Sequence, residues 1–508
     1  MRIRAFLLVV LALGALAPTA GPLAAAAETT TMLDAAEIQA RIDAASPGAV
    51  IVIEPGTYHG NLVVEAAVTL RGEGRPVIHG DGTGSVILVK ADGVTIEGLR
   101  IEHSSVGPIG GPAGIRVEAD DVTIVDNVVE DTYMGIAAFG ASRLKVVDNV
   151  VRGRQSAAMG AEGHAADPAA TEDQGQELEA AADAGHEHSA AAAASGRVYR
   201  GDGISLWNCE QTLVRDNVVE DSRDGIYMSF GTSIILDRNR IVESRYAIHS
   251  MYAEDLTAVE NAFEGNLSGA ILMYGGPVLM LRNRVVDSDS ASTGFGLLLK
   301  DVFGADVVEN LFVSNRIGIQ IDGPAGDTEH AIVIRRNTVA TNRFGVSLYP
   351  TAHAVFSGNS FVENAVQVVA QGDGVSGKNT WYDDGIGNYW SDYRGYDLDG
   401  GGLGDLPHNE GGALESLVVR APVLQALASG PAFSLLRAVE DRWVEHAAIV
   451  EDPLPLMEPH SPAVRDGATG GTASTTLAAA GLIALVLAGV VIVALRRPMR
   501  RGRASHAT

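Results

Sequence analysis

The chain has 508 residues, with 37 lysines and arginines against 63 aspartates and glutamates, and a formal net charge of −26 at pH 7. A charge this negative argues against nucleic acid or an anionic lipid surface as the partner of the protein. The single cysteine, Cys209, excludes an internal disulfide, so packing must stabilise the fold. The 59 glycines are scattered among aliphatic residues, which indicates many turns rather than one long linker.

The N-terminal residues predict a secretory signal peptide over 1–27. Arg2 and Arg4 precede an apolar run at 5–17, and small residues follow as far as Ala27. A basic start, a short apolar core and an Ala-rich exit are typical of an exported protein. We expect cleavage within 24–27 and an extracytoplasmic (periplasmic) location for the residues that follow.

The next segments predict a short helix followed by short strands. Residues 35–45 (AAEIQARIDAA) have the pattern of an amphipathic helix, and 51–64 and 68–80 have the alternation of strands. A stack of strands that began without a cover would leave an open sheet edge. The helix is therefore expected to cap the first coil of the fold.

The central part of the chain repeats with a period of about 22 residues. Short aliphatic strands end in asparagines at 127, 149, 217, 239, 261, 283, 310, 337 and 359, and the successive intervals are 22, 68, 22, 22, 22, 27, 27 and 22. The two intervals of 27 indicate five-residue loop insertions, one before Gly296 and one after Asp322. The interval of 68 indicates two coils and a further insertion. Eight positions after most of these asparagines, a small residue opens the next strand.

Such a unit cannot bury a hydrophobic face by itself. Stacked at about 4.8 Å per coil, the units share hydrogen bonds along the axis and bury a continuous aliphatic column. The asparagine suits a turn that needs a positive φ or a side-chain hydrogen bond, and stacked asparagines can bond from coil to coil. Leucine-rich repeats have a similar length, but their LxxLxL spacing and helical half-repeat are missing. The sequence predicts an all-β, right-handed parallel β-helix over 28–385.

An interval at 152–200 interrupts the repeat. Between residues 160 and 190 there are eight acidic residues and no lysine or arginine, with His186 and His188 among alanines. This composition predicts an acidic, His- and Ala-rich surface loop. Two histidines at i and i+2 could bind Cu(II) or zinc, and solvated loop histidines are the alternative.

Strand alternation separates the core from the outer face of one sheet. The core columns run through Ile204, Ile226, Ile248, Ala270, Leu297, Ile319 and Val346, and through Leu206, Met228, Ser250, Leu272, Leu299, Ile321 and Leu348. The outer face presents Trp207, Tyr227, His249, Met251 and Met273, and Tyr252 and Tyr274 follow at the strand ends. Aromatic and methionine side chains on an outer face predict a partner-contact surface.

Met251 and Met273 fall in one column on consecutive coils, and His249 points the same way as Met251. Two thioethers and an imidazole suit a soft metal, above all Cu(I). The alternative is that an insertion folds over this face and buries it. Cys209 follows Trp207 in a turn and is expected to be an incidental thiol rather than a ligand.

The sequence shows few features that are typical of an enzyme. Many β-helices depolymerise acidic sugars with Asp/Glu clusters beside His, Lys or Arg on an outer strand face. Here the only outward carboxylate of the predicted face is Asp322, and neither the GHG nor the RIK element of polygalacturonases occurs. No catalytic residue is predicted.

The segment 386–460 contains two further elements. Asp397, Asp399 and Asp405 (DLDGGGLGD) are spaced among glycines as in calcium loops, with a Gly-rich turn as the alternative. Residues 431–447 place Leu436 and Trp443 on one helical stripe, which either caps the β-helix or docks on a partner.

The C-terminal residues predict a membrane anchor. A linker at 461–476 precedes an uncharged run at 477–495, which is long enough for a transmembrane helix. Five arginines lie in the tail 496–508, so this tail is expected to be cytoplasmic and the rest of the mature chain outside.

Several segments resemble the NosD family of β-helical accessory proteins for nitrous oxide reductase maturation. They are GDGISLWN (201–208), YAIHSMYAEDLT (246–257), GAILMYGGPVLMLRNR (269–284), GFGLLLKDV (294–302) and NYWSDYRGYDLDGGGLGDLPH (388–408). The resemblance runs from about 48 to 457. The long loop at 152–200 and the membrane helix depart from the family pattern.

The resemblance implies a copper-binding accessory protein that works with an ATP-binding cassette (ABC) transporter to insert copper, with sulfide, into nitrous oxide reductase. A copper chaperone is a further possible partner. Ligand positions do not follow from the resemblance. Two other classes stay open from the residues alone. One is a carbohydrate-binding or polysaccharide-active β-helix, which Trp207 and Tyr227 would suit, and the other is a structural surface protein.

Overall fold

The computed structural model describes residues 32–154, 200–290, 293–322, 331–371, 379–410 and 449–460. The signal peptide, the loop histidines His186 and His188, the stripe residues Leu436 and Trp443, the linker and the segment 477–495 lie outside these residues. Within the described ranges, no helix has both the length and the apolar character that a membrane crossing requires.

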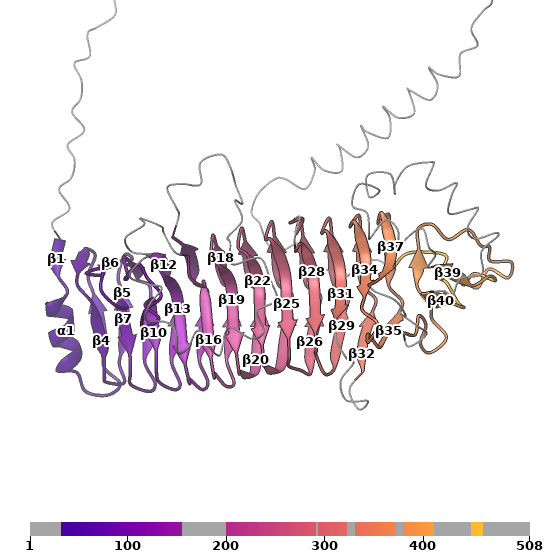
Figure 1. Cartoon of the computed structure of the whole chain (residues 1–508). Helices are drawn as coiled ribbons and strands as arrows, with labels where there is room; N and C mark the ends of the chain where they lie inside the picture. Colours follow the sequence, from indigo (N-terminus) through magenta and orange to yellow (C-terminus); the bar gives the residue numbers. More distant parts are fainter. Residues whose placement is uncertain are drawn as a thin grey trace, which may run out of the picture.

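The described strands form three long parallel sheets, each with one strand from successive coils (Figure 1). Sheet A contains β1 Met32–Asp34, β3 Thr57–His59, β6 Val77–His79, β9 Arg100–Glu102, β12 Val128–Thr132, β15 Val150–Gly153, β18 Val218–Glu220, β21 Arg240–Val242, β24 Ala262–Glu264, β27 Arg284–Val286, β30 Leu311–Val313, β33 Thr338–Ala340, β36 Ser360–Val362 and β38 Tyr389–Trp390. Sheet B contains β2 Val50–Ile53, β5 Thr69–Gly72, β8 Thr95–Glu97, β11 Thr123–Val125, β14 Lys145–Val147, β17 Leu213–Arg215, β20 Thr232–Asp237, β23 Glu254–Val259, β26 Val278–Leu281, β29 Ala305–Val308, β32 Ile332–Arg335 and β35 Ala354–Ser357. Sheet C contains β4 Leu62–Val64, β7 Ile87–Val89, β10 Ala113–Val117, β13 Met134–Phe139, β16 Ile204–Trp207, β19 Asp224–Ser229, β22 Tyr246–Met251, β25 Ser268–Met273, β28 Phe295–Lys300, β31 Ile317–Asp322, β34 Phe344–Leu348 and β37 Val366–Ala370. This stack confirms the predicted parallel β-helix.

The pairing register follows the sequence repeat. Arg240 pairs with Ala262 and Ala262 with Arg284, each one repeat length apart, while Arg284 pairs with Leu311 across a short insertion. Val150 pairs directly with Val218, so β15 and β18 belong to adjacent coils. The expectation of two coils between Asn149 and Asn217 is therefore wrong. A single coil carries one long insertion.

The helix α1, Ala36–Asp43, lies at the N-terminal end of the stack (Figure 1). Ile38 and Ile42, which share one face of the helix, are buried in the same core cluster as the first coils. The Gln39 side chain pairs with the Val63 backbone of β4, donating to its carbonyl at 2.9 Å and accepting from its amide at 2.9 Å. The helix is thereby held against the edge strand.

The two predicted aliphatic columns of sheet C are the core. Ile204, Ile226, Leu206 and Met228 are fully buried in one cluster that runs through the stack. Close packing explains why a small residue opens these strands. A Cβ added at Gly225 would lie 2.3 Å from Ile241 Cγ2 and 2.8 Å from the Ala247 carbonyl oxygen, which is too close for any larger side chain.

The recurrent asparagines form a buried ladder along the axis. Each side-chain amide donates to the side-chain oxygen of the next asparagine at 2.9–3.1 Å, from Asn127 through Asn149, Asn217, Asn239, Asn261, Asn283, Asn310, Asn337 and Asn359 to Asn388. The coil-to-coil hydrogen bonding is confirmed. The positive φ belongs instead to the residue before the asparagine, as at Arg238 (φ 53°) and Glu260 (φ 53°).

The C-terminal end of the stack is closed by aromatic rings and a short antiparallel pair, β39 His408–Glu410 with β40 Val450–Asp452 (Figure 1). Trp381 stacks on Phe356 at 4.2 Å and Trp390 on Phe361 at 4.4 Å, measured between ring centroids. The buried Asp452 accepts from the Asn388 amide at 2.7 Å and from Trp390 Nε1 at 2.9 Å. The asparagine ladder therefore ends on a carboxylate.

Candidate metal-binding and partner-contact surface

The predicted aromatic stripe is present on sheet C. The rings of Trp207 and Tyr227 lie 5.4 Å apart, and Tyr227 meets His249 edge-on at 5.2 Å. These side chains stand on β16, β19 and β22, one coil after another. The stripe is more enclosed than the sequence reasoning expected, because Tyr227 is only 4% and Met251 only 5% exposed. The expectation of a solvent-facing stripe is wrong for these two residues.

Met251 and Met273 are direct register partners between β22 and β25. Their backbones are therefore one inter-strand spacing apart, about 4.8 Å. Met251 is buried and Met273 half-buried, and both alternate away from core residues such as Ile248 and Leu272. His249 precedes Met251 by two positions on the same side of β22. The strand geometry brings the three predicted ligands to one patch of the sheet.

The imidazole of His249 is held by a buried carboxylate. Its Nδ1 lies 2.9 Å from Asp224 Oδ2, and its ring also meets Tyr246 edge-on at 5.3 Å. Metal-ligating histidines commonly have one nitrogen on a carboxylate, which fixes the ring and directs the other nitrogen to the ion. Sequence reasoning missed Asp224, because it precedes the small residue that opens the strand and falls outside the counted columns.

A buried charge network surrounds this histidine. Arg245 donates to both Asp224 oxygens at 2.8 Å, and one coil earlier Arg223 donates to Asp202 at 3.0 and 3.1 Å. Burial raises the pKa of Asp202 despite its pairing with Arg223. Burial would likewise raise the pKa of Asp224, but Arg245 and the His249 hydrogen bond outweigh it and hold this pKa below its ordinary value. Asp224 is therefore an anion at neutral pH.

A second aromatic row runs along the turns that follow sheet C. Phe230 stacks on Tyr252 at 4.9 Å, and Tyr252 on Tyr274 at 5.2 Å. Phe230 is 54% and Tyr252 40% exposed, and all three residues have a positive φ, which is rare for bulky side chains. Sequence reasoning found Tyr252 and Tyr274 at these strand ends and missed Phe230. We call the three residues the turn aromatic row.

The Asp/Gly segment forms a compact turn. The Asp397 carboxylate accepts hydrogen bonds from the amides of Gly400 at 2.7 Å and Gly402 at 2.7 Å, and Asp405 accepts from the Leu398 amide at 2.7 Å. The amide hydrogen bonds, foremost that of Gly402, lower the pKa of Asp397. This geometry matches the Gly-rich turn that was the alternative to calcium, and calcium binding stays a prediction.

Cys209 is fully buried, and its thiol lies 3.4 Å from the Trp207 carbonyl oxygen and 3.6 Å from that of Ala138. Burial raises the pKa of this thiol to about 11. The folded protein therefore favours the neutral thiol, and the metal-binding thiolate is suppressed at neutral pH.

We expect Cys209 to resist a disulfide reagent such as DTNB at pH 8 and to react at once after denaturation in guanidinium. Burial of the thiol also makes the free energy of unfolding depend on pH. Because the pKa of Cys209 is raised in the folded state, the contribution of the neutral thiol is present below the unfolded pKa of about 8.5 and declines as the pH rises towards 11. Absorbance at 412 nm measures the reaction. Rapid labelling of the native protein would contradict the buried placement.

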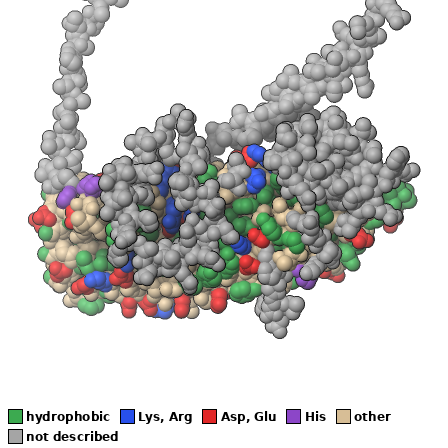
Figure 2. Space-filling model, viewed as in Figure 1, with side chains coloured by type: hydrophobic (Ala, Val, Ile, Leu, Met, Phe, Trp, Pro, Cys, Tyr) green, Lys and Arg blue, Asp and Glu red, His purple; other side chains and the backbone are tan. Residues whose placement is uncertain are grey.

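Three histidines stack at the N-terminal end of sheet A, a feature that sequence reasoning did not single out. His59 and His79 are 5.7 Å apart, and His79 and His103 4.6 Å apart. Figure 2 shows histidine side chains gathered near this end of the stack. His79 Nδ1 lies 3.0 Å from Glu102 and His103 Nδ1 3.3 Å from Asp131. These contacts explain the row as stacked rings, two of which, His79 and His103, pair with carboxylates.

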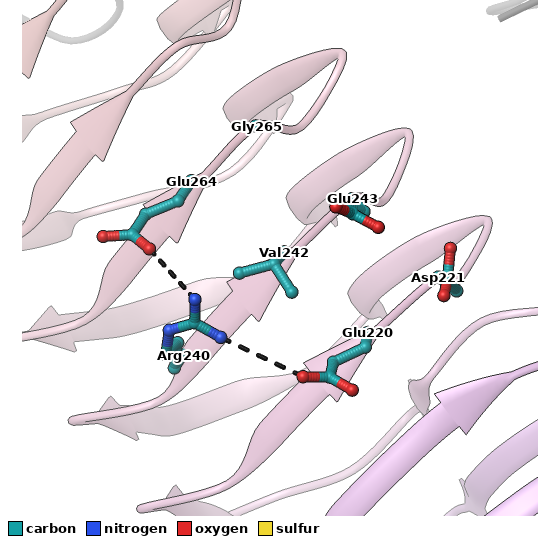
Figure 3. Close-up of a pocket in the computed structure, with 7 residues that line it drawn as sticks. All are labelled: Glu220, Asp221, Arg240, Val242, Glu243, Glu264 and Gly265. Atoms are coloured by element: carbon teal, nitrogen blue, oxygen red, sulfur yellow. Dashed lines mark hydrogen bonds and ion pairs between the residues drawn. The ribbon is translucent and has the colours of Figure 1, made fainter. Parts of the chain in front are cut away.

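The outer face of sheet A carries alternating charges. Arg240 lies between Glu264 at 3.1 Å and Glu220 at 4.0 Å, as Figure 3 shows. Arg152 bridges Glu220 at 3.1 Å and Glu130 at 3.5 Å in the same way. A pocket of about 420 Å³ lies over this row. Two of its glutamates, Glu220 and Glu264, pair with arginines from neighbouring coils, so the row is explained as an ion-pair ladder that supports the stack.

Comparison with known proteins confirms the resemblance inferred from sequence. Residues 186–395 match the family described as "Periplasmic copper-binding protein (NosD)". The chain is 27% identical over 415 residues to the "Probable ABC transporter binding protein NosD" of Pseudomonas aeruginosa, covering 79% of this chain and 86% of that protein. It is 27% identical over 421 residues to the protein of the same name from Stutzerimonas stutzeri, covering 79% and 85%.

Some solved structures are similar to this chain at low sequence identity. The catalytic unit of a GH87 α-1,3-glucanase from Streptomyces thermodiastaticus is 14% identical with a TM-score of 0.48, over 71% of this chain and 66% of that one. The A-module of a mannuronan C-5 epimerase from Azotobacter vinelandii is 14% identical with a TM-score of 0.42, over 69% and 94%. Their activities carry no argument for this chain.

Proposed function

The chain is related to the NosD proteins, and on that premise we propose that it is an extracytoplasmic accessory protein of nitrous oxide reductase maturation. In this role it receives copper as cargo and assists the assembly of the copper-sulfide centre together with an ABC transporter. It acts as a binding protein rather than an enzyme. The family description and the names of the two relatives support the accessory role.

The observation that carries the copper proposal is the anchoring of His249 by Asp224 on the strand that places Met251 beside Met273. An imidazole held by a carboxylate and two thioethers make a soft ligand set that suits Cu(I). The site lies on the outer side of the sheet and is partly enclosed, because Met251 is 5% exposed while His249 and Met273 are half-buried. A transfer protein must release its ion, and the two half-buried ligands leave the site accessible.

We further propose that the turn aromatic row contacts a partner. Exposed, stacked aromatic rings supply rigid apolar area at low conformational-entropy cost. The half-buried Trp207 on sheet C adds to this aromatic area, and the buried Tyr227 supports it from beside at 5.4 Å. Candidate partners are the membrane subunit of the transporter, nitrous oxide reductase and a copper chaperone. A C-terminal anchor at 477–495, with its basic tail inside, would hold the protein beside the transporter.

The double substitution Met251→Leu/Met273→Leu tests the copper site. It keeps the apolar volume and removes both thioethers, so folding should change little while Cu(I) affinity falls about tenfold or more. Competition with a chromophoric Cu(I) chelator measures the affinity. The matched control is Met228→Leu/Met280→Leu, which removes two thioethers from the core and should leave Cu(I) binding unchanged.

The cellular readout is the copper content of the reductase. A strain that lacks this gene should make copper-depleted reductase. Expression of the control variant Met228→Leu/Met280→Leu in this strain should restore the copper content. The Met251/Met273 variant should restore it poorly. Restoration of normal copper content by this variant, with unchanged Cu(I) affinity, would place the site elsewhere and make His186 and His188 the leading candidates.

A further inference from the structure

A cluster of potential metal ligands lies at the C-terminal end of the β-helix, away from the surface described above. His408 and Glu410 stand two positions apart on β39 and are both buried, with the exposed Asn409 between them. Asp392, in the turn after β38, completes the cluster. The ligand atoms of the three side chains all lie within 4.8 Å of one another.

Among the described residues, one ring nitrogen of the histidine in this cluster, His408 Nε2, has no hydrogen-bond partner. His408 is 8% exposed, and its Nε2 is buried with no donor or acceptor in hydrogen-bond range. The nearest carboxylate oxygen, Glu410 Oε1, lies at 3.6 Å, which is too long for a hydrogen bond and places Nε2 towards that carboxylate. A buried polar atom without a partner costs about 1–3 kcal/mol. The atom thus points to a ligand that the described part of the chain does not supply.

The ring is held in place from two sides. Trp390 stacks on the His408 ring at 4.6 Å, and Tyr393 meets it edge-on at 6.0 Å. Trp390 is itself fixed by the hydrogen bond from its Nε1 to Asp452. The position of Nε2 is therefore set by the packing of the end of the stack.

We propose that Asp392, His408 and Glu410 bind a divalent cation of the zinc class. One imidazole nitrogen and two carboxylate oxygens suit Zn²⁺, which takes such ligands at about 2.0–2.2 Å. The ligand atoms of a tetrahedral zinc site lie about 3.4 Å apart, within reach of small side-chain movements from the present separations. The set has no thioether or thiolate, so it differs in kind from a Cu(I) site.

The bound cation has a structural role. Asp392 follows the last strand of sheet A, whereas His408 and Glu410 belong to the antiparallel pair that closes the stack. An ion shared by these segments ties the closing pair to the β-helix and protects its open edge. This site is independent of the copper proposal, since none of its ligands belongs to the His249 patch.

The test uses the full-length protein, stripped of metal with a chelator and titrated with Zn²⁺ alone. We expect one bound equivalent that requires these residues, and a melting temperature that rises with the logarithm of free Zn²⁺. Glu410→Gln and Asp392→Asn should each weaken this binding about tenfold or more and abolish the stabilisation. The control, Glu451→Gln, changes an exposed glutamate on the partner strand β40 and should bind as the parent does.

One further variant and one fallback comparison make the outcome decisive. A His186→Ala/His188→Ala background removes the loop histidines, and the equivalent assigned to Asp392, His408 and Glu410 should persist in it. If Glu410→Gln loses its β-rich circular dichroism, Asp392→Asn, which changes a less buried position, decides the matter. Parent-like zinc affinity in Asp392→Asn, or a melting temperature that Zn²⁺ does not change, would overturn the proposal.

Discussion

Asn261→Ala should destabilise the β-helix more than any exposed substitution of the same kind. The Asn261 side chain is 1% exposed and is hydrogen-bonded on both of its polar atoms. Its oxygen accepts from the Asn239 amide at 2.8 Å and from Asn239 Nδ2 at 3.0 Å. Its nitrogen donates to the Leu236 carbonyl at 2.9 Å and to Asn283 Oδ1 at 2.9 Å. The substitution removes the side-chain partners of the Asn239 backbone amide and the Leu236 carbonyl, whereas Asn283 Oδ1 and Asn239 Nδ2 keep their bonds to the residue-261 amide and the Val214 carbonyl. Two buried groups without these partners cost about 2–6 kcal/mol in the free energy of unfolding.

The measurement is the urea midpoint or melting temperature, combined with hydrogen exchange of the Asn239 amide. That amide should lose protection first, because its acceptor is removed. Asn409→Ala is the matched control: this asparagine is exposed on β39 and its substitution should change the free energy of unfolding by about 0.5 kcal/mol or less. Equal stability of the two variants would show that the ladder contributes little.

The ladder illustrates what periodicity can predict. Asparagines that recur once per repeat must fall at equivalent positions of successive coils, so their contact follows from the repeat alone. The same reasoning failed between Asn149 and Asn217. The long interval between these two asparagines fits either a skipped coil or a long insertion, and only the pairing of Val150 with Val218 distinguishes them.

The repeat also explains why the candidate copper site could be predicted only in part. Met251 and Met273 share a column on consecutive coils, so their pairing could be inferred. The burial of Met251 could not, because alternation tells only which side of a strand a residue lies on, and not whether anything covers that side. Asp224 was missed because it precedes the small residue that opens β19 and so falls outside the columns that alternation defines.

The cluster at the closed end was beyond sequence reasoning for a different reason. Asp392 and His408 are separated by a turn with no repeat, and no spacing rule brings them together. Their contact depends on the stacking of Trp390 with His408 and on the pairing of β39 with β40. Both are tertiary features that arise once per molecule.

Asp224→Asn should give the second large effect. Asp224 is fully buried. It is the counter-ion of Arg245, whose side chain is 24% exposed, and the hydrogen-bond partner of His249, whose side chain is 13% exposed. The substitution keeps the size of the side chain but removes the negative charge. An arginine left in a buried site without its counter-ion costs about 3–5 kcal/mol. The imidazole of His249 also loses the acceptor that orients it, so Cu(I) affinity should fall together with stability.

The loss of stability in Asp224→Asn should depend on pH. Because the folded pKa of Asp224 lies below its ordinary value, the stability contributed by the carboxylate is present above the unfolded pKa of about 3.9 and is lost as the pH falls through the folded pKa. Asp224→Asn should therefore be much less stable than the parent at pH 7, and the difference should shrink in acid below about pH 4. Asp216→Asn is the control, since Asp216 pairs with Arg238 on the surface, with side chains 33% and 47% exposed, and should cost about 1 kcal/mol or less. Urea denaturation of the three proteins from pH 3 to pH 8 measures both effects, and a parent-like midpoint for Asp224→Asn at pH 7 would contradict the buried ion pair and the anchoring of His249.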